Sequence, residues 1–444
     1  MSDWSIYVSL LIPHDTAAKI LLVADGDNWT LPRFKLNATY SKLHLLQRAV
    51  HERYGAKMTV LRWIYSHEDE AQQTVTGLWL MEQHTPDWIP PQDAKWADVN
   101  SLENIPLQDE ILRSALSQAV ATLQEPDPVE RVPWMRRGWF TTAQKWMADT
   151  LVAQGYELKA PPEQFKNFSL SALLRAETTS EVIYFKVANQ FPLFCHEPKT
   201  TQTLGTLFPT YIPKPIAIHE ERRWMLTPDF GHSLRDENPN VETLERIVQT
   251  FANFQISTAS MLDTLMESGC LDRRLNVLAS QIDDLMADEA CIIGLDTNER
   301  TAWRATAPTL KALCVKLADF NIPDTLVHGD FHAGNITQQG EKTTFFDWTD
   351  ACIGHPFFDL PIFINFDAAD HEEVLRDAYL ACWTAYESIE RLREAYQIAQ
   401  ILGWLHQAVS YQGIRTHSEP FYRNQWDWAV PHFARLIIEK LREI

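Results

Sequence analysis

The stretch His328-Gly-Asp-Phe-His-Ala-Gly-Asn335, with Phe345-Phe-Asp-Trp348 shortly after it, decides most about this chain. It places a carboxylate at Asp330, a side-chain amide at Asn335 and a second carboxylate at Asp347. In phosphoryl transfer from a nucleotide, one carboxylate accepts the proton of the attacking hydroxyl. An amide oxygen and another carboxylate hold Mg²⁺ against the phosphates. The pattern therefore predicts phosphoryl-transfer chemistry.

The spacing of these groups supports that interpretation. Asp330 and Asn335 are close enough in sequence to share one loop, and a short apolar strand, 325–327, precedes the loop. Residues 342–346 predict a second strand, so a hairpin would carry Asp347 back over the loop. The alternative is a structural loop, because Asp, Asn, Gly and His are ordinary turn formers. The flanking strands and Gly334 make the functional interpretation the more specific one.

Composition limits the classes of protein that fit. The chain has 444 residues and 45% apolar residues, enough for two or three domains with substantial cores. Its formal net charge of −20 argues against general nucleic-acid binding and against binding to anionic membranes. We find no signal-peptide pattern and no apolar run of membrane-spanning length, so we expect a soluble, cytoplasmic protein. The six cysteines are scattered without a C-x-x-C pair, which predicts reduced thiols and neither a disulfide framework nor a zinc site.

Hydrophobic patterning and turn residues divide the chain into segments. The acidic, proline-bearing run at 124–131 predicts a linker between an N-terminal domain, 1–123, and a second domain. The second domain divides into a strand-rich lobe with a leading helix, 132–232, and a helix-rich lobe, 233–444. We expect an α+β protein with the site chemistry in the second lobe.

Local patterns predict the individual elements. Strands are expected at 5–12, 19–23, 58–65, 74–81, 167–176 and 182–187. Helices are expected at 41–54, 101–123, from the Trp139 region to about 153, and at 197–207. From Val241 onward the patterns are helical, interrupted only by the hairpin at 325–347.

The motifs of the second domain resemble those of a known family. Residues 131–444 resemble the aminoglycoside phosphotransferase/choline kinase family, which has a bilobal protein-kinase-like fold. The resemblance is carried by His328-Gly-Asp-x-x-x-x-Asn335, Asp347-Trp-Thr-Asp350 and His355-Pro-Phe-Phe-Asp-Leu360. It implies Mg²⁺-dependent transfer of a phosphate from ATP or GTP to a hydroxyl of a small molecule.

The resemblance also implies roles for individual residues. Asp330 would be the catalytic base, and Asn335 and Asp347 would bind Mg²⁺. His328 would brace the catalytic loop by hydrogen bonding. Asp359 would anchor that loop from the following helix without touching substrate.

The strand-rich lobe should supply the nucleotide-binding groups. Lys186 ends an alternating strand, as a phosphate-contacting lysine does in this fold, and Glu197 is the best match for its partner. The alternatives are a surface lysine and a glutamate that favours a helix N-terminus. No G-x-G-x-x-G loop precedes Lys186, so Ser169 and Ser171 are the candidates to face the phosphates. The segment 224–231 would be the hinge that contacts the adenine.

The N-terminal domain resembles a Nudix domain, an α/β/α sandwich, in its order of strands and helices and in Trp29-Thr-Leu-Pro32. Aligned on Arg48 and Gly55, the chain keeps only Glu52 of the catalytic glutamates. Ala49 and Arg53 stand where two neighbouring glutamates are expected, and Phe34 and Tyr40 replace the upstream Gly and Glu. One carboxylate is too few to hold metals against a pyrophosphate. We therefore predict a Nudix-like domain without hydrolase activity.

The leading hypothesis is a phosphotransferase whose acceptor site lies in the C-terminal helices, between about 367 and 417. Acidic residues there would suit a cationic acceptor, although they also fit an ordinary helix N-terminus. These residues are Asp367, Asp370, Glu372 and Glu373. Trp383, Trp404 and Tyr411 would either line an aromatic pocket or belong to the core. The alternative hypothesis is a nucleotide-binding regulatory or scaffold protein with little turnover and a metabolite-sensing Nudix-like domain. Association into a homodimer is left open.

Overall fold

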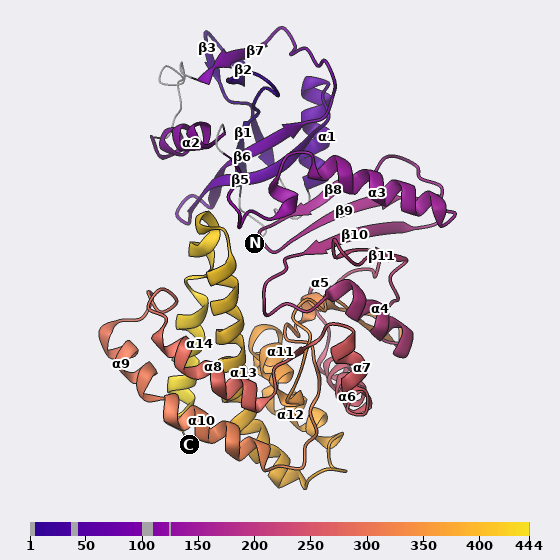
Figure 1. The fold of residues 1–444 in the computed structure, drawn as a ribbon, viewed down its shortest axis with the longest axis vertical. Coiled ribbons are helices and arrows are strands. Elements are labelled where there is room, and N and C mark those ends of the chain that lie inside the picture. The colour runs from indigo at the N-terminus through magenta and orange to yellow at the C-terminus, as the bar shows by residue number, and fades with distance from the viewer. Residues whose placement is uncertain (1–4, 37–42, 100–109, 124–125, 444) are drawn as a thin grey trace. The chain divides into compact units, whose positions relative to one another are not determined.

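The computed structural model describes residues 5–36, 43–99, 110–123 and 126–443, and the chain divides into two compact units, residues 1–187 and 188–444 (Figure 1). The division lies within the predicted segment 132–232, so the predicted domain boundaries stay predictions. Tyr40, the start of the helix expected at 41–54 and much of the helix expected at 101–123 lie outside the described residues.

The first unit begins with strands and two helices and ends with a second group of strands. Its strands are β1 (Ser5–Leu11), β2 (Lys19–Asp25), β3 (Asn28–Thr30), β4 (Arg33–Leu36), β5 (Met58–Asp69), β6 (Thr74–Gln83), β7 (Ala94–Asp98), β8 (Glu163–Asn167), β9 (Ser171–Glu177) and β10 (Val182–Ala188). Its helices are α1 (Leu43–Tyr54), α2 (Glu110–Thr122), the 3₁₀ turn η2 (Pro133–Met135) and α3 (Trp139–Ala153).

The N-terminal strands form a sheet that is covered on both faces. The sheet has the order β4-β1-β6-β5, with β1 and β6 parallel. Because side chains alternate along a strand, Val8 and Leu10 pack on the α1 side while the next residue, Leu11, packs on the α2 side. Strands β3, β2 and β7 form a separate sheet. The layers of the β4-β1-β6-β5 sheet are therefore helix, sheet and helix. The Nudix-like α/β/α sandwich stays a prediction.

Helix α1 illustrates how the sequence sets these layers. Leu43, Leu46, Val50 and Tyr54 recur at helical spacing and are all buried. The helix ends where Gly55 adopts φ +70° and donates its N–H to the carbonyl of His51. An L-residue with a side chain adopts that conformation only with strain, so glycine suits the end of this helix.

The end of the first unit is a small antiparallel sheet with α3 packed on it. The strand order is β10-β9-β8. Trp139 and Trp146 of α3 both lie edge-on to Phe185 of β10, with ring centroids 5.9 Å apart in each pair. Strand β8 and the short strands β3, β4 and β7 were not predicted.

The second unit is mainly helical. Its helices are α4 (Glu197–Leu207), α5 (Leu234–Glu237), α6 (Val241–Thr258), α7 (Leu262–Glu267), α8 (Leu275–Ala287), α9 (Thr297–Ala305), α10 (Ala307–Ala318), α11 (Asp359–Asp367), α12 (Glu372–Ala381), α13 (Ile389–His417) and α14 (Ala429–Lys440). The 3₁₀ turns are η3 (Ala333–Asn335), η4 (Pro356–Phe358), η5 (Ala369–His371) and η6 (Pro420–Trp426). The strands are β11 (Ala217–His219), β12 (Trp224–Pro228), β13 (Leu271–Asp272), β14 (Thr325–Val327), β15 (Ile336–Gln339), β16 (Lys342–Phe345) and β17 (Cys352–Gly354).

The core of the second unit surrounds α13, whose middle part, from Ile398 to Ser410, is buried throughout. Buried Arg273 ties the small sheet β13-β17-β14 to this helix. It donates one hydrogen bond to the Ser410 hydroxyl at 2.8 Å and one to the His406 carbonyl at 3.0 Å. Strands β13 and β17 correct the expectation that only one hairpin interrupts the helices after Val241. Each is too short to leave a periodic signal in the sequence.

Two predicted elements have direct counterparts here. The helix at 197–207 has its predicted bounds, and the strand expected at 342–346 is β16, which pairs with β15 within the expected hairpin segment 325–347. All six cysteines are free. Among the described residues, no helix has both the length and the apolarity to cross a membrane.

Candidate active site

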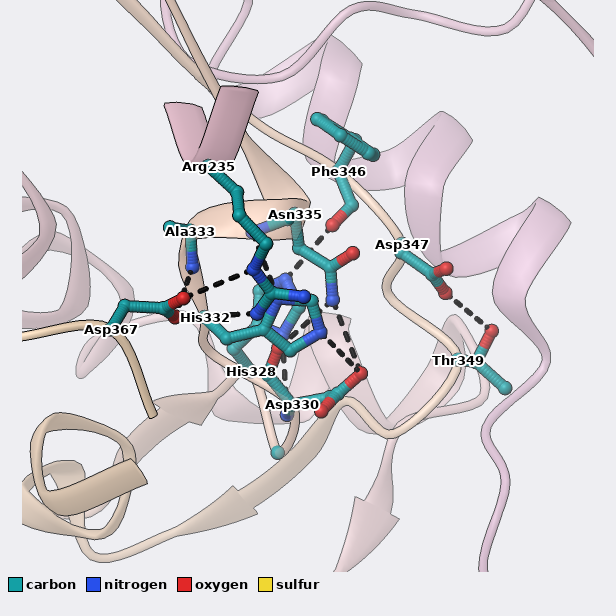
Figure 2. Close-up of polar contacts among 12 residues, drawn as sticks. Arg235, His328, Asp330, His332, Ala333, Asn335, Phe346, Asp347, Thr349 and Asp367 are labelled. Carbon is teal, nitrogen blue, oxygen red and sulfur yellow. Dashed lines mark hydrogen bonds and ion pairs between the residues drawn. The ribbon is translucent and has the colours of Figure 1, made fainter. Parts of the chain in front are cut away.

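The loop His328–Asn335, the predicted catalytic loop, follows strand β14 and carries Asp330 at a partly exposed position (Figure 2). The Asp330 side chain is 43% exposed. Its Oδ2 atom faces the Asn335 amide nitrogen at 3.2 Å and the His332 Nε2 atom at 3.4 Å. Its Oδ1 atom has no hydrogen bond within the described residues, so one carboxylate oxygen is free to accept a proton.

Asn335 and Asp347 meet because β15 and β16 form a tight hairpin. Ile336 pairs with Phe345, and the Phe346 N–H donates to the Asn335 carbonyl at 3.1 Å. The Asn335 amide nitrogen also donates to the Asp330 carbonyl at 2.9 Å, which leaves its oxygen on the Asp347 side (Figure 2). Asp347 sits at φ +65°, a conformation that aspartate tolerates better than most residues, and its Oδ1 accepts from the Thr349 hydroxyl at 2.9 Å.

This pair of residues suits a magnesium ion. Mg²⁺ prefers oxygen ligands, and in nucleotide sites it is held by one or two carboxylates together with substrate phosphates. The Asn335 amide oxygen and the Asp347 carboxylate are such ligands, from one hairpin. No cluster of three or more His, Cys, Asp or Glu side chains with metal-site geometry occurs in the described part of the chain. A magnesium site here would therefore depend on phosphate oxygens to complete it.

His328 joins the two halves of the site. Its buried ring accepts the Asp330 N–H at Nδ1, 3.3 Å away, which places the ring proton on Nε2. That Nε2–H donates to the Phe346 carbonyl at 3.0 Å. Burial lowers the pKa of His328 to about 4, so the ring is neutral at physiological pH. Through these contacts the ring links the Asp330 and Phe346 backbones, and the bracing role implied for His328 stays a prediction.

Asp359, the first residue of α11, holds the start of the loop. Its two carboxylate oxygens accept the N–H groups of His328 at 2.8 Å and Gly329 at 2.9 Å. The Gln255 amide donates to the same carboxylate at 3.1 Å. Burial raises the pKa of Asp359 to about 7, against the two backbone hydrogen bonds, which lower it. Asp359 faces the loop backbone and not the open side of Asp330.

His332 is a further residue of the site that the sequence did not identify. Its Nδ1 accepts the Gly334 N–H at 2.9 Å, so its Nε2 carries the proton that faces Asp330. Burial lowers the pKa of His332, but the hydrogen bond with Asp330 and the charge of that carboxylate raise it by more. Burial likewise raises the pKa of Asp330, yet His332 outweighs it, so Asp330 ionises more readily than a free aspartate.

The expected nucleotide-binding residues lie in both units. Lys186 is in β10 of the first unit, as are Ser169, buried in the turn before β9, and Ser171, the first residue of β9. Glu197 is buried at the start of α4 in the second unit. The pairing of Lys186 with Glu197 and the contacts of the two serines therefore stay predictions.

The expected acceptor residues separate into three groups. Asp367 reaches the catalytic loop, where it forms an ion pair with Arg235. Asp370 and Glu373 are exposed, and Glu372 accepts a hydrogen bond from Gln400 at 3.1 Å.

The aromatic candidates favour the core interpretation. Trp383 and Trp404 are buried in the core. Tyr411 packs against Trp426, Trp428 and Phe433. These contacts favour packing of the three residues over an aromatic acceptor pocket.

Comparison with known proteins assigns the segment that carries this geometry. Residues 202–395 match the model of the phosphotransferase enzyme family, APH. This segment belongs to that family. It contains Asp330, Asn335, Asp347 and Asp359 but neither Lys186 nor Glu197, and it spans less than half of the chain. No curated protein matches the sequence.

Solved structures of phosphotransferases and kinases are similar to this chain at low identity. A choline/ethanolamine kinase family protein from Mesorhizobium loti is 13% identical, over 69% of this chain and 99% of that chain, with a TM-score of 0.47. Ethanolamine kinase from Plasmodium vivax is 13% identical, over 77% and 99%, with a TM-score of 0.49. The GDP and kanamycin complex of APH(2″)-IIia is 14% identical, over 67% and 99%, with a TM-score of 0.49. With scores below 0.5, the assignment to the phosphotransferase family rests on the family match.

Proposed function

We propose that this phosphotransferase moves the γ-phosphate of ATP or GTP to a hydroxyl group of a small molecule in a Mg²⁺-dependent reaction. The observation that carries the proposal is the convergence of Asp330, Asn335 and Asp347 in one loop and hairpin, with Asp330 partly open to solvent. The match of residues 202–395 to the phosphotransferase enzyme family supports it.

Asp330 is the proposed catalytic base. Its Oδ2 is occupied by Asn335 and His332, so Oδ1 is the oxygen that accepts the hydrogen bond of the attacking hydroxyl. Its lowered pKa keeps the carboxylate ionised at neutral pH, in the state that can take a proton. Orientation of the hydroxyl in line with the phosphate supplies much of the rate enhancement in such reactions.

Asn335 and Asp347 are the proposed Mg²⁺ ligands, and the bound ion would neutralise charge that develops on the phosphates. Lys186, oriented by Glu197, is proposed to contact the phosphates, with Ser169 and Ser171 as further donors. The acceptor is proposed to be a hydroxyl compound bound by the C-terminal helices. Of the acidic candidates, Asp370 and Glu373 remain exposed for a cationic acceptor.

A nucleotide-consumption screen against amino alcohols, aminoglycosides and sugars tests the proposed function. The Asp330→Asn variant should still bind nucleotide but lose about 100-fold to 10,000-fold in kcat, the usual contribution of a general base. Asp319→Asn, at an exposed carboxylate after α10, is the matched control and should retain full activity. Unchanged turnover in Asp330→Asn, with a phosphorylated product formed, would contradict the assignment.

A second role, for the first unit, is supported by a cavity of about 440 Å³ that lies within that unit. Its lining includes the charged residues Arg48, Glu52 and Lys57 and the aromatic residue Phe140. The volume is in the range of small-molecule sites. We propose that this unit binds a metabolite and regulates the phosphotransferase. Of the alternative hypothesis of a regulatory or scaffold protein, this proposal keeps the metabolite-sensing domain but not the little turnover.

Thermal melting with a panel of nucleoside diphosphate derivatives tests this second role. A stabilising compound should shift the Tm equally in wild type and Asp330→Asn but fail to shift it in Phe140→Glu. Lys35→Glu, at an exposed position outside the cavity, should respond like wild type. Stabilisation that persists in Phe140→Glu would place the ligand elsewhere and remove the support for this role.

A further inference from the structure

An ion pair between Arg235 of α5 and Asp367 at the end of α11 lies against the catalytic loop (Figure 2). The Arg235 Nε is 3.1 Å from one carboxylate oxygen of Asp367, and its Nη2 is 3.4 Å from the other. The arginine side chain is 51% exposed, whereas the aspartate side chain is only 9% exposed. The pair is therefore bidentate, with its carboxylate turned inward.

The Asp367 carboxylate also binds the loop backbone directly. Its Oδ2 accepts the Ala333 N–H at 2.7 Å, at the first residue of the 3₁₀ turn that leads to Asn335. Both carboxylate oxygens thus accept hydrogen bonds. Oδ1 binds Arg235 alone, and Oδ2 binds both Arg235 and the Ala333 N–H. This arrangement removes Asp367 from the candidates for binding a cationic acceptor.

The turn beneath Arg235 is packed too closely for a side chain at Gly334. A Cβ atom there would lie 2.6 Å from His332 Cε1 and 3.4 Å from Arg235 Nη1. The Gly334 N–H is bound by His332 Nδ1, and the other ring nitrogen of His332 faces Asp330. A continuous set of contacts therefore runs from Arg235 and Asp367 through the Ala333–Gly334 turn to the carboxylate of Asp330.

The segment before α5 is tied to the same hairpin at a second place. Gln339 of β15 donates to the Phe230 carbonyl at 3.1 Å, and Phe230 packs on Phe346 with ring centroids 5.2 Å apart. Arg235 thus follows a segment that is already held beside Phe346, the residue before Asp347. The ion pair adds a third element, α11, to this arrangement.

We propose that Arg235 and Asp367 are positioning residues that fix the Ala333–Gly334 turn, and with it His332 and Asp330, for phosphoryl transfer. The inference rests on the proposed function, because it assigns a role relative to Asp330 as base. Loss of either partner should leave the nucleotide site in place and displace the catalytic loop. A displacement of about 1 Å can lower a rate by about 100-fold.

The test compares Asp367→Ala, Arg235→Gln and Arg235→Lys in the full chain. Turnover is measured with the acceptor from the screen, or as hydrolysis where water is the acceptor. We expect kcat to fall by at least about tenfold in Asp367→Ala, which removes both the ion pair and the acceptor of the Ala333 N–H. The loss of kcat should be smaller in Arg235→Gln, and smaller again in Arg235→Lys, which keeps the positive charge. In all three variants the KM for the nucleotide should stay within about twofold of wild type.

The matched control is Arg435→Gln, which breaks a pair of similar geometry and exposure far from the loop in sequence. Arg435 is 50% exposed and binds Glu299 through Nε at 2.7 Å and Nη2 at 3.0 Å. It should keep wild-type kcat. Hydrogen–deuterium exchange over 328–335 supplies a readout that does not depend on activity. It should rise in Asp367→Ala and Arg235→Gln but not in the control.

The outcomes separate the two proposals. If the wild type is active and both Asp367→Ala and Arg235→Gln keep its kcat and its hydrogen exchange, the positioning role alone is overturned. A kcat loss in Arg435→Gln equal to that in Arg235→Gln also overturns it, because general destabilisation would then explain both. A wild type with no turnover on any nucleotide contradicts the proposed function, and the positioning role falls with it.

Discussion

At the scale of single residues, polar contacts hold the loop, and the Asn335 amide nitrogen and Asp330 Oδ2 each take part in two of them. His328 accepts from one neighbour and donates to another, so its neutral state is fixed by its contacts. Asp359 satisfies two consecutive loop N–H groups that are buried and would otherwise lack an acceptor. Leaving such a group unsatisfied costs about 1–3 kcal/mol. The loop therefore holds its shape through side chains that bind its backbone.

Thr349 offers a test of how Asp347, a proposed Mg²⁺ ligand, is oriented. Its hydroxyl donates to Asp347 Oδ1, so Thr349→Val removes one hydrogen bond with little change in volume. Loss of a partner that orients a metal ligand typically lowers metal affinity by about 10-fold to 100-fold. We expect the Mg²⁺ concentration for half-maximal nucleotide turnover to rise by that factor. Thr344→Val, in buried β16 of the same hairpin, should leave the Mg²⁺ dependence unchanged.

At the scale of elements, the hairpin β15–β16 determines which residues meet. The Ile336–Phe345 register brings Phe346 back to the Asn335 backbone and Asp347 next to it. A shift of one residue would turn the side chains of β16 to the opposite face. The sequence predicted the second strand of this hairpin, at 342–346, and a hairpin within 325–347, but it did not predict the first strand, β15. It did not predict α5, whose four residues from Leu234 to Glu237 are too few to show a helical period.

Helix α4 packs on a neighbouring segment closely enough to require glycine. A Cβ at Gly205 would lie 2.6 Å from Lys214 Cα and 2.9 Å from Lys214 N, both backbone atoms. Gly205→Ala should therefore lower the free energy of unfolding by about 1–3 kcal/mol, despite the better helix propensity of alanine. Urea denaturation measures this change. Thr206→Ala, at the next and exposed position of α4, should change stability by less than about 0.5 kcal/mol. Equal stability of Gly205→Ala and wild type would contradict the close packing.

At the scale of the whole molecule, each unit has its own core and carries its own buried, neutral histidines. Burial lowers the pKa of His84 in the first unit to about 4 and that of His355 in the second unit to about 3. His84 is held between the hydroxyls of Thr59 at 2.8 Å and Thr141 at 3.5 Å. His355 accepts the Phe357 N–H at 3.3 Å. Both rings are thus built into the fold in their uncharged form.

These histidines predict a loss of stability in acid. Each pKa is lower in the folded state than in the unfolded state, so the unfolded chain binds more protons below about pH 6.5. The stabilising contribution is complete above that pH and is lost as the pH falls toward 3–4. When the pH falls from 7 to 5, each histidine should lower the free energy of unfolding by about 2 kcal/mol.

Denaturation of His84→Gln and His355→Asn at both pH values checks this expectation. In each variant the free energy of unfolding should fall by about 2 kcal/mol less between pH 7 and pH 5 than it does in wild type. If the unfolding free energy of the variants changes with pH as much as that of wild type, groups other than these histidines govern the acid sensitivity.

The sequence by itself determined the chemistry and the local elements that carry it. The identities of Asp330, Asn335 and Asp347, the strand before the loop and the hairpin after it follow from residues that are close in sequence. Their turn and strand preferences act locally, so no distant part of the chain is needed to interpret them.

Only the tertiary structure decided which distant residues support that chemistry. Arg235 and Asp367 are 132 positions apart, and Gln255 and Asp359 are 104 apart, yet each pair forms hydrogen bonds. Such pairings depend on how helices pack, which depends on shape complementarity over many side chains and leaves no periodic mark in the sequence. For that reason Asp367 looked like an acceptor-binding acid in the sequence, while its contacts place it under the catalytic loop.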